Sequence, residues 1–371
     1  MIKLASPDIR ESDIQKAVEV IQSGNLIQGR NVLAFEKALS AFAHIENCSV
    51  VSSGTAALHL ALLALGIKPG DTVIVPAFTF PATANVVENI GANVLLCDVD
   101  KESYVVTPEA IETLIEINRD KNIKAIIVVH EFGYPVRIKE IAEISKRYRL
   151  KLIEDAACAL GTIADGFHVG YYSDAACFSF HPRKAVTTGE GGAIISKDEL
   201  LIDKIKVLRN HGIDMVNKQT DFLLAGLNYR MTDFQAALVL GQLERFREEL
   251  KKRIELVSIY NNLLKSNQNI TLPFNNQGHS WQSFMVVFKK QINRNLLIEK
   301  LKEVGIQTSL GAQALNCLYY YRQKYGVNEK SCPQANLLYN QGLVLPLYGK
   351  LKTVDIKYIS DKLHEEMECM L

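Results

Sequence analysis

The stretch CFSFHPRKAVTTGEGGAII, residues 177–195, places a lysine between two short apolar runs. The runs ACFSF (176–180) and GAIIS (192–196) combine aromatic, β-branched and small residues, which favours buried strands. The connection between them carries Lys184 and ends in the glycine-rich GEGG. A lysine held at a sheet edge among apolar neighbours is partly desolvated, so we expect its pKa to be lowered and its amine to be nucleophilic. The alternative is an ordinary solvated lysine on a turn.

Upstream of this stretch, short apolar runs alternate with helical patterns. The sequence predicts strands at 48–53, 71–76, 92–100, 124–130 and 151–157. It predicts helices at 54–66, 82–91, 107–117 and 137–149. Strands that are apolar on both faces and separated by helices indicate an α/β fold with a mainly parallel sheet sandwiched by helices.

Downstream of Met231 the pattern changes. Residues 232–265 read as one long amphipathic helix with room for a single break, followed by a strand at 283–290. Helices are predicted at 293–304 and 353–368. Since 371 residues exceed what one hydrophobic core usually supports, we expect two domains. These are a large domain with an N-terminal helical segment (1–245) and a smaller C-terminal α+β domain (246–371).

Composition excludes several classes of protein. Hydrophobic residues make up 48% and charged residues 22%, the net charge is +1, and no basic stripe is interleaved with aromatics, so no nucleic-acid partner is expected. The seven cysteines show no CxxC or Cys/His spacing, which argues against a metal site and a disulfide framework. The N-terminus MIKLASPDIRESD has no apolar signal core, and no apolar run could span a bilayer. We therefore expect a cytoplasmic protein without a membrane partner.

Polar residues lie where the predicted strands end. Asp155 ends a buried strand, and open α/β sheets bind ligands at the carboxyl ends of their strands. This carboxylate could hold a heteroaromatic N–H⁺, or it could be an ordinary cap or loop residue. Ser53, Gly54 and Thr55 stand at a helix start, where backbone N–H groups bind phosphate, although Ser53 or Thr55 could simply cap the helix. Ser179 would supply another hydroxyl.

Phe80, in PAFTFPATAN, is a core aromatic or a stacking plate for a planar ring. Each candidate alone has an ordinary structural explanation. Together they provide a phosphate cradle, a ring stacker, a carboxylate for a ring nitrogen and an amine for an aldehyde. These are the four requirements of pyridoxal 5′-phosphate (PLP).

Eight motifs, in one order and over nearly the whole length, carry a resemblance. They are SGNLIQGRNVLAFE, SSGTAALHLAL, PAFTFPATANVV, IEDAACALG, FSFHPRKAVTTGEGGA, LRNHGI, GLNYRMTDFQAALVLGQLERF and LPLY. The chain resembles the DegT/DnrJ/StrS family of PLP-dependent sugar aminotransferases. The resemblance implies the fold-type I architecture, with a large sheet domain and a smaller C-terminal α+β domain.

The resemblance also implies residue roles. Lys184 would bind PLP covalently as a Schiff base and shuttle the proton, Asp155 would pair with the pyridine nitrogen, and Phe80 would stack on the ring. Asn228 would reach the phosphate of the other subunit, which implies a homodimer with shared active sites. The phosphate would be held by Ser53, Gly54, Thr55 and Ser179.

Position 158 departs from the family pattern. The family usually has Gln or His there, contacting the phenolic oxygen of the cofactor, whereas this chain has Cys158. A thiol is a weak hydrogen-bond donor, so we expect a weaker contact or a water in its place. Neutral replacement by a small residue is the alternative.

By resemblance, the protein would convert a nucleotide-linked keto-sugar to an amino-sugar, as in polysaccharide biosynthesis, with L-glutamate as amino donor. Alternatives are an aminocyclitol aminotransferase and a catalytically silent regulator on the same fold. The family's dehydratase branch replaces the lysine by histidine, so Lys184 argues against it. No G-x-G-x-x-G follows the first strand, which argues against a dinucleotide-binding enzyme. Segments 23–30, 279–284 and 306–322 are candidates for the substrate mouth.

Overall fold

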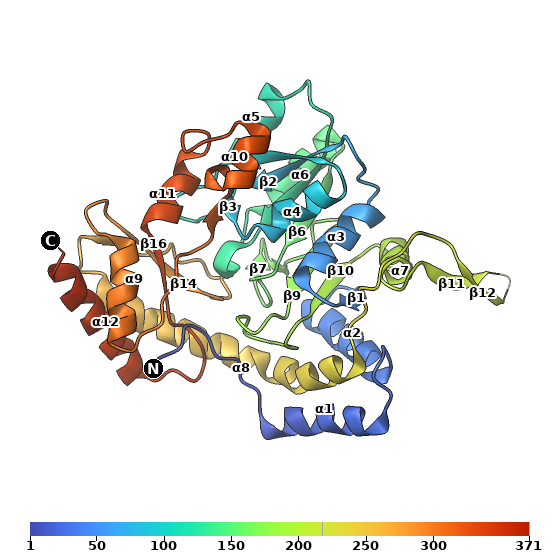
Figure 1. Cartoon of the computed structure of the whole chain (residues 1–371), viewed down its shortest axis with the longest axis horizontal. Coiled ribbons are helices and arrows are strands. Elements are labelled where there is room, and N and C mark those ends of the chain that lie inside the picture. The colour runs from blue at the N-terminus through green and yellow to red at the C-terminus, as the bar shows by residue number, and fades with distance from the viewer. Residues whose placement is uncertain (217, 371) are drawn as a thin grey trace.

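A seven-stranded sheet organises the larger part of the protein, seen in a computed structural model that describes residues 1–216 and 218–370 (Figure 1). The strand order is β1-β10-β9-β6-β5-β2-β4. Their bounds are β1 (Asn47–Val51), β2 (Thr72–Pro76), β4 (Asn93–Cys97), β5 (Ile123–Val129), β6 (Lys151–Asp155), β9 (Ala175–Ser179) and β10 (Gly192–Ser196). Neighbouring strands from β9 to β4 are parallel, which confirms the mainly parallel sheet.

Strand β10 runs antiparallel to both of its neighbours, β9 and β1. Only residues 180–191 connect β9 to β10, and this connection contains no helix to carry the chain back across the sheet. The chain therefore reverses direction and pairs with the strand it has just left. All residues of β2 and β10 are buried, as expected for strands covered on two sides.

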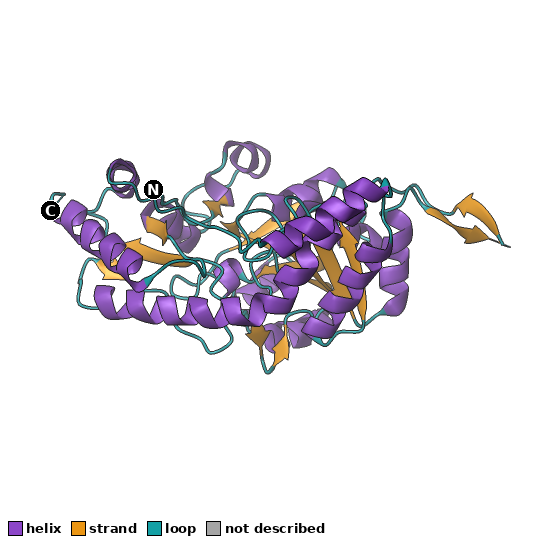
Figure 2. Cartoon of the chain, turned by 90° about the horizontal axis from the view of Figure 1, so that it is seen from below, coloured by secondary structure: helices purple, strands orange, loops and turns teal. Residues whose placement is uncertain are grey.

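Helices cover both faces of this sheet (Figure 2). One face packs against α2 (Arg30–Ala43), α5 (Pro108–Ile117), α6 (Ile138–Tyr148) and the first half of α8 (Asp233–Leu264). The other face packs against α3 (Gly54–Ala64), α4 (Ala82–Asn89) and α7 (Glu199–Leu208). Phe35 and Val239 belong to the first core, and Leu60 and Ile205 to the second. An outer helix, α1 (Glu11–Ser23), lies along α8 (Figure 1).

A second, three-stranded sheet forms the C-terminal core. It contains β13 (Ile270–Thr271), β14 (Phe284–Phe288) and β16 (Gly342–Leu345), all antiparallel, and it packs with α9 (Arg294–Glu303), α12 (Thr353–Glu368) and the second half of α8. Tyr260 of α8 and Leu363 of α12 are fully buried in this core. The proposed division between residues 245 and 246 falls within α8, which runs unbroken through both cores.

The chain returns to the large sheet before its last helix. Strand β15 (Gln313–Ala314) pairs with β3 (Phe78–Thr79), and α10 (Tyr319–Tyr325) and α11 (Pro333–Gln341) follow. The hydroxyl oxygen of Tyr325 accepts a hydrogen bond from the Val94 N–H on edge strand β4 at 2.9 Å. Segment 313–341 therefore contacts the large sheet directly.

A β-hairpin projects from the body of the protein (Figures 1 and 2). Its strands are β11 (Ile213–Val216) and β12 (Gln219–Phe222), and the side chains of Met215, Phe222 and Leu223 are exposed. The shortest elements are η1 (Glu131–Gly133), η2 (Leu315–Cys317), β7 (Ile163–Ala164) and β8 (Phe167–His168). Within the described ranges, no helix is both long enough and apolar enough to cross a membrane.

Candidate active site

A cavity of about 510 Å³ lies at the carboxyl ends of β5, β6 and β9. The C-terminal segments around Gln282, Ser309 and Val344 line another side of it. Open α/β sheets bind ligands at this edge. The cavity brings together eight of the nine candidate residues: Ser53, Gly54, Thr55, Phe80, Asp155, Cys158, Ser179 and Lys184. Asn228 is not among the lining residues.

The start of helix α3 lies directly against the end of strand β9. A Cβ at Gly54 would stand 2.9 Å from the Cβ of Ser179, and a Cβ at Gly192 would stand 2.3 Å from the carbonyl oxygen of Ser53. Glycine at both positions is what permits this close approach. The Ser53 Oγ accepts a hydrogen bond from the Ala56 N–H at 3.0 Å and so caps the helix. The N–H groups of Gly54 and Thr55 have no partner inside the helix and remain for an anion.

Asp155 is held by two hydrogen bonds at the end of β6. Its Oδ2 accepts from the Thr83 hydroxyl at 2.7 Å, and its Oδ1 accepts from the Ala157 N–H at 3.1 Å. Burial raises the pKa of this carboxyl, while the bonds from Thr83 and Ala157 and the charge of Lys184 act in the opposite direction. A cationic N–H entering the cavity would favour the ionised form further. Sequence reasoning missed Thr83, whose only signal is its place two residues after Pro81 at a helix start.

The Lys184 amine is surrounded by acidic groups. Its Nζ lies 3.0 Å from the Cys158 Sγ. Burial lowers the pKa of Lys184, but Cys158, Glu131 and Asp155 together outweigh burial and raise it. The expectation of a lowered pKa is therefore wrong, because it considered only the apolar neighbours along the chain. Burial also raises the pKa of the Cys158 thiol.

Gln282 fixes the backbone on both sides of the lysine. Its Nε2 donates to the Arg183 carbonyl at 2.8 Å, and its Oε1 accepts from the Ala185 N–H at 3.1 Å. The carbonyl of Gln282 itself accepts from Nη1 of the buried Arg253, on α8, at 3.1 Å. The C-terminal core thus holds the loop that carries Lys184. The sequence indicated the segment 279–284 but not this role.

Phe80 has a free face in the cavity. Its side chain is 72% exposed, so the interpretation as a core aromatic is wrong. It directly precedes Pro81, the N-cap residue of α4, and its carbonyl accepts a hydrogen bond from the Thr83 N–H at 3.2 Å. An exposed ring on an anchored turn can stack on a planar ligand.

The sequence pattern of the DegT/DnrJ/EryC1/StrS aminotransferase family matches residues 7–364 of the chain. The chain belongs to this family. The match confirms the resemblance found from the sequence, and the protein is accordingly a PLP-dependent aminotransferase.

Related proteins extend this assignment. An uncharacterized protein of Methanocaldococcus jannaschii is 34% identical over 364 residues, covering 94% of this chain and 93% of its own. A proposed sugar aminotransferase of Streptococcus pneumoniae, solved in its PMP form, superposes with a TM-score of 0.93 at 26% identity over 100% of both chains. Helicobacter pylori PseC, an aminotransferase of pseudoaminic acid biosynthesis, superposes with a TM-score of 0.92 at 25% identity over 99% of both chains.

The cavity of this DegT/DnrJ/EryC1/StrS aminotransferase fits the cofactor that the family uses. The close approach of Gly54 to Ser179 forms a cradle that any added Cβ would fill. Asp155 offers a buried carboxyl and Lys184 an amine in the same cavity. The donor set therefore suits a phosphate, a ring nitrogen and an aldehyde.

Asn228 lies outside the cavity of its own subunit. It belongs to the segment that follows the projecting hairpin, where it is exposed and forms an isolated β-bridge with Asn210. The structure of one chain thus brings Asn228 to the surface and not to Lys184.

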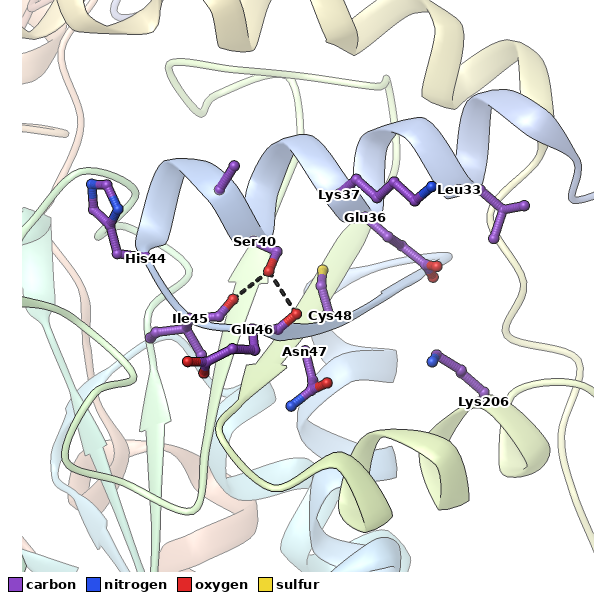
Figure 3. Close-up of a pocket in the computed structure, with 11 residues that line it drawn as sticks. Leu33, Glu36, Lys37, Ser40, His44, Ile45, Glu46, Asn47, Cys48 and Lys206 are labelled. Carbon is purple, nitrogen blue, oxygen red and sulfur yellow. Dashed lines mark hydrogen bonds between the residues drawn. The ribbon is translucent and has the colours of Figure 1, made fainter.

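A separate hollow of about 620 Å³ lies between α2, β1 and Lys206 of α7 (Figure 3). Its polar groups already serve the fold: the Ser40 hydroxyl donates to the Glu46 carbonyl at 2.8 Å, and Glu36 Oε1 accepts from Arg209 at 2.5 Å. Burial raises the pKa of the Cys48 thiol well above its usual range, which makes it a poor nucleophile. Although this hollow is larger, it does not carry the chemistry of an active site.

Proposed function

We propose that this aminotransferase moves an amino group from L-glutamate to a keto-sugar linked to a nucleotide. The observation that carries the proposal is the meeting of Lys184, Asp155, Phe80 and the start of α3 in one cavity. The structural similarity to PseC, an aminotransferase of pseudoaminic acid biosynthesis, supports a sugar-like substrate. The segment around Ser309 and Gly311, indicated from the sequence as part of the substrate mouth, lines the cavity.

We propose the following roles for the cavity residues. Lys184 binds PLP covalently, Asp155 accepts a hydrogen bond from the ring nitrogen, and Phe80 stacks on the ring. The phosphate is held by Ser53, Gly54, Thr55 and Ser179. When bound, PLP supplies an electrophilic aldehyde and an electron-withdrawing ring. Cys158 contacts the Lys184 amine and gives the cofactor at most a weak hydrogen bond.

The raised pKa of Lys184 defines how it handles protons. Its Nζ holds a proton at neutral pH when the amine is free, because the pKa of this amine is raised above its ordinary value. In the proposed reaction the amine first gives up this proton and then, as a neutral base, moves a proton between the substrate carbon and the aldehyde carbon of the cofactor. Gln282, through Arg183 and Ala185, keeps this nitrogen in place.

The test of the proposal is the absorption spectrum of the purified protein before and after L-glutamate is added. We expect a yellow, lysine-bound cofactor band that converts to the spectrum of the pyridoxamine form. A band that glutamate leaves unchanged would exclude glutamate as donor. Absence of a band after PLP is added would contradict the proposal at Lys184. A subsequent comparison of nucleotide-linked keto-sugars with a ring ketone lacking a nucleotide separates the proposed substrate from an aminocyclitol precursor.

We also propose a homodimer in which Asn228 completes the partner's phosphate site. The exposed apolar side chains of Met215, Phe222 and Leu223 on the adjacent hairpin support an interface there. Asn228→Ala should therefore weaken PLP retention, measured by dialysis and absorbance.

Subunit mixing tests whether the residue acts across the interface. When Asn228→Ala and Lys184→Ala subunits are mixed in equal amounts, half of the dimers are mixed and each has one intact site, so about a quarter of all sites should regain activity. If no activity returns, Asn228 serves only its own subunit.

A further inference from the structure

Buried carboxyl groups in this protein almost all have a side-chain partner. Among the residues that the structure describes, seven acidic residues are buried, and six of them accept a hydrogen bond from another side chain. The six pairs are Asp13 with Arg245, Glu36 with Arg209, Asp71 with Asn122, Glu154 with His130, Asp155 with Thr83 and Asp233 with Asn31. The seventh, Glu131, is only 6% exposed and, within the described ranges, accepts no hydrogen bond from another side chain; its partner is the backbone of Phe132. It lines the active-site cavity together with Lys184.

A strained turn holds Glu131 at this position. Glu131 begins η1, two residues after the end of β5, and the next residue, Phe132, has φ of 56°. This left-handed conformation is unfavourable for a bulky residue and persists only where its surroundings impose it. The Phe132 carbonyl accepts from the Gln282 N–H at 2.9 Å, and the Gly133 carbonyl accepts from the Thr162 hydroxyl at 2.8 Å. The segment before β14 and the loop that follows β6 therefore both fix the turn that carries Glu131.

Glu131 and Lys184 influence each other's charge. Burial raises the pKa of Glu131 to about 7, the charge of Lys184 lowers it, and that of Asp155 raises it. In return, Glu131 raises the pKa of Lys184. The charge of each group therefore favours the ionised form of the other.

The other charged and titratable groups of the cavity are less suited to pair with this lysine. Cys158 is closest and contributes most to the raised pKa of Lys184, but this contribution requires an ionised thiol, and the raised pKa of Cys158 keeps the thiol neutral at neutral pH. Asp155 is already engaged by Thr83 and Ala157. The remaining groups that line the cavity are His181, Arg183 and Glu190, all from the loop after β9, and Glu190 is exposed. The C-terminal segments contribute no charged residue to the lining.

We propose that Glu131 is a positioning residue of this active site, whose carboxylate stabilises positive charge on the Lys184 nitrogen, both in the free amine and in its linkage to the cofactor. The proposal rests on the proposed function, since it requires Lys184 to carry PLP. It gives Glu131 the electrostatic task that the neutral thiol of Cys158 cannot perform. It also explains why a carboxyl is kept buried on a strained turn without a side-chain partner.

The test is a pH titration of the lysine-bound cofactor band, whose wavelength reports whether the linking nitrogen is protonated. Glu131→Gln keeps the shape but removes the charge, so the midpoint should fall by about 1 pH unit or more. Glu131→Asp should restore part of the shift. Glu190→Gln is the matched control, because Glu190 lines the same cavity but is exposed and screened by solvent. Its midpoint should equal that of the wild type.

A second readout uses the cofactor-free protein. The rate at which added PLP combines with Lys184 depends on the free-base amine, so its pH profile should move to lower pH in Glu131→Gln. This measurement applies even if the variant retains PLP poorly, and circular dichroism checks that it is folded.

The outcomes separate the two proposals. If the wild type shows the cofactor band, and Glu131→Gln has the same midpoint and the same rate profile as the wild type, the role of Glu131 is overturned and the proposed function stays intact. An unchanged midpoint with a raised KM for the sugar would likewise overturn it, by assigning Glu131 to substrate binding. No cofactor band in the wild type would overturn both.

Discussion

Lys184→Ala is expected to reduce turnover by on the order of 10⁴-fold, the largest effect of any substitution considered, because it removes the covalent attachment point and the proton carrier together. The variant should remain folded, since the side chain faces a cavity and its polar contact there is with the Cys158 thiol. The measurements are 2-oxoglutarate release from glutamate for turnover, circular dichroism for folding and size-exclusion chromatography for assembly.

Lys206→Ala provides the matched control for this experiment. Lys206 also lines a hollow, the one in Figure 3, but its side chain is 42% exposed and its ion-pair partner is Asp203, three residues away on the same helix. Turnover of this variant should equal that of the wild type. Activity of Lys184→Ala within tenfold of the wild type would remove Lys184 from the mechanism.

Asp155→Asn is expected to lower kcat by about 10- to 150-fold, since a hydrogen bond to a charged group contributes roughly 1.5–3 kcal/mol. The amide can still accept the hydrogen bond of Thr83, so the local packing should persist. What is lost is the negative charge that would favour a protonated ring nitrogen.

Thr83→Val separates charge from positioning. It removes the hydroxyl donor, but the Asp155 carboxyl can still ionise. Thr83→Val should therefore reduce kcat less than Asp155→Asn does. Steady-state kinetics with glutamate, together with the PLP content of each variant, gives the order. Equal kcat for wild type and Asp155→Asn would show that this carboxylate does not act on the ring.

The local pattern of the sequence predicted most of the regular structure. The helix expected at 353–368 is α12 with the same bounds, and the long helix expected at 232–265 is α8, without a break. These elements have a strong apolar period, which directly reflects the face that they bury. The antiparallel direction of β10 and the return of segment 313–341 to the large sheet depend on tertiary packing, which leaves little signal in a local pattern.

The residues of the candidate site could also be predicted only where the local pattern of the sequence indicates them. Eight of the nine candidate residues meet in one cavity because each lies at a strand end or helix start, positions that the α/β pattern locates. Thr83, Glu131 and Gln282 were missed, since each acts on a residue far away in the sequence. The same reason explains the wrong direction expected for the pKa of Lys184: the acidic groups beside it come from the ends of β5 and β6.

The length of helix α8 determines how the C-terminal core lies relative to the active site. It begins at Asp233, whose Oδ1 accepts from the N–H groups of Gly29 and Val32, and it continues for 32 residues into the C-terminal core. Such a helix is about 48 Å long, and each residue in it adds about 1.5 Å of length and about 100° of rotation around the helix axis. A loop absorbs an inserted residue, but this helix would transmit it as a rotation of the whole C-terminal core. Gln282 would then no longer reach Arg183 and Ala185 on either side of Lys184. The enzyme should therefore tolerate substitutions along α8 far better than an insertion or deletion in this helix.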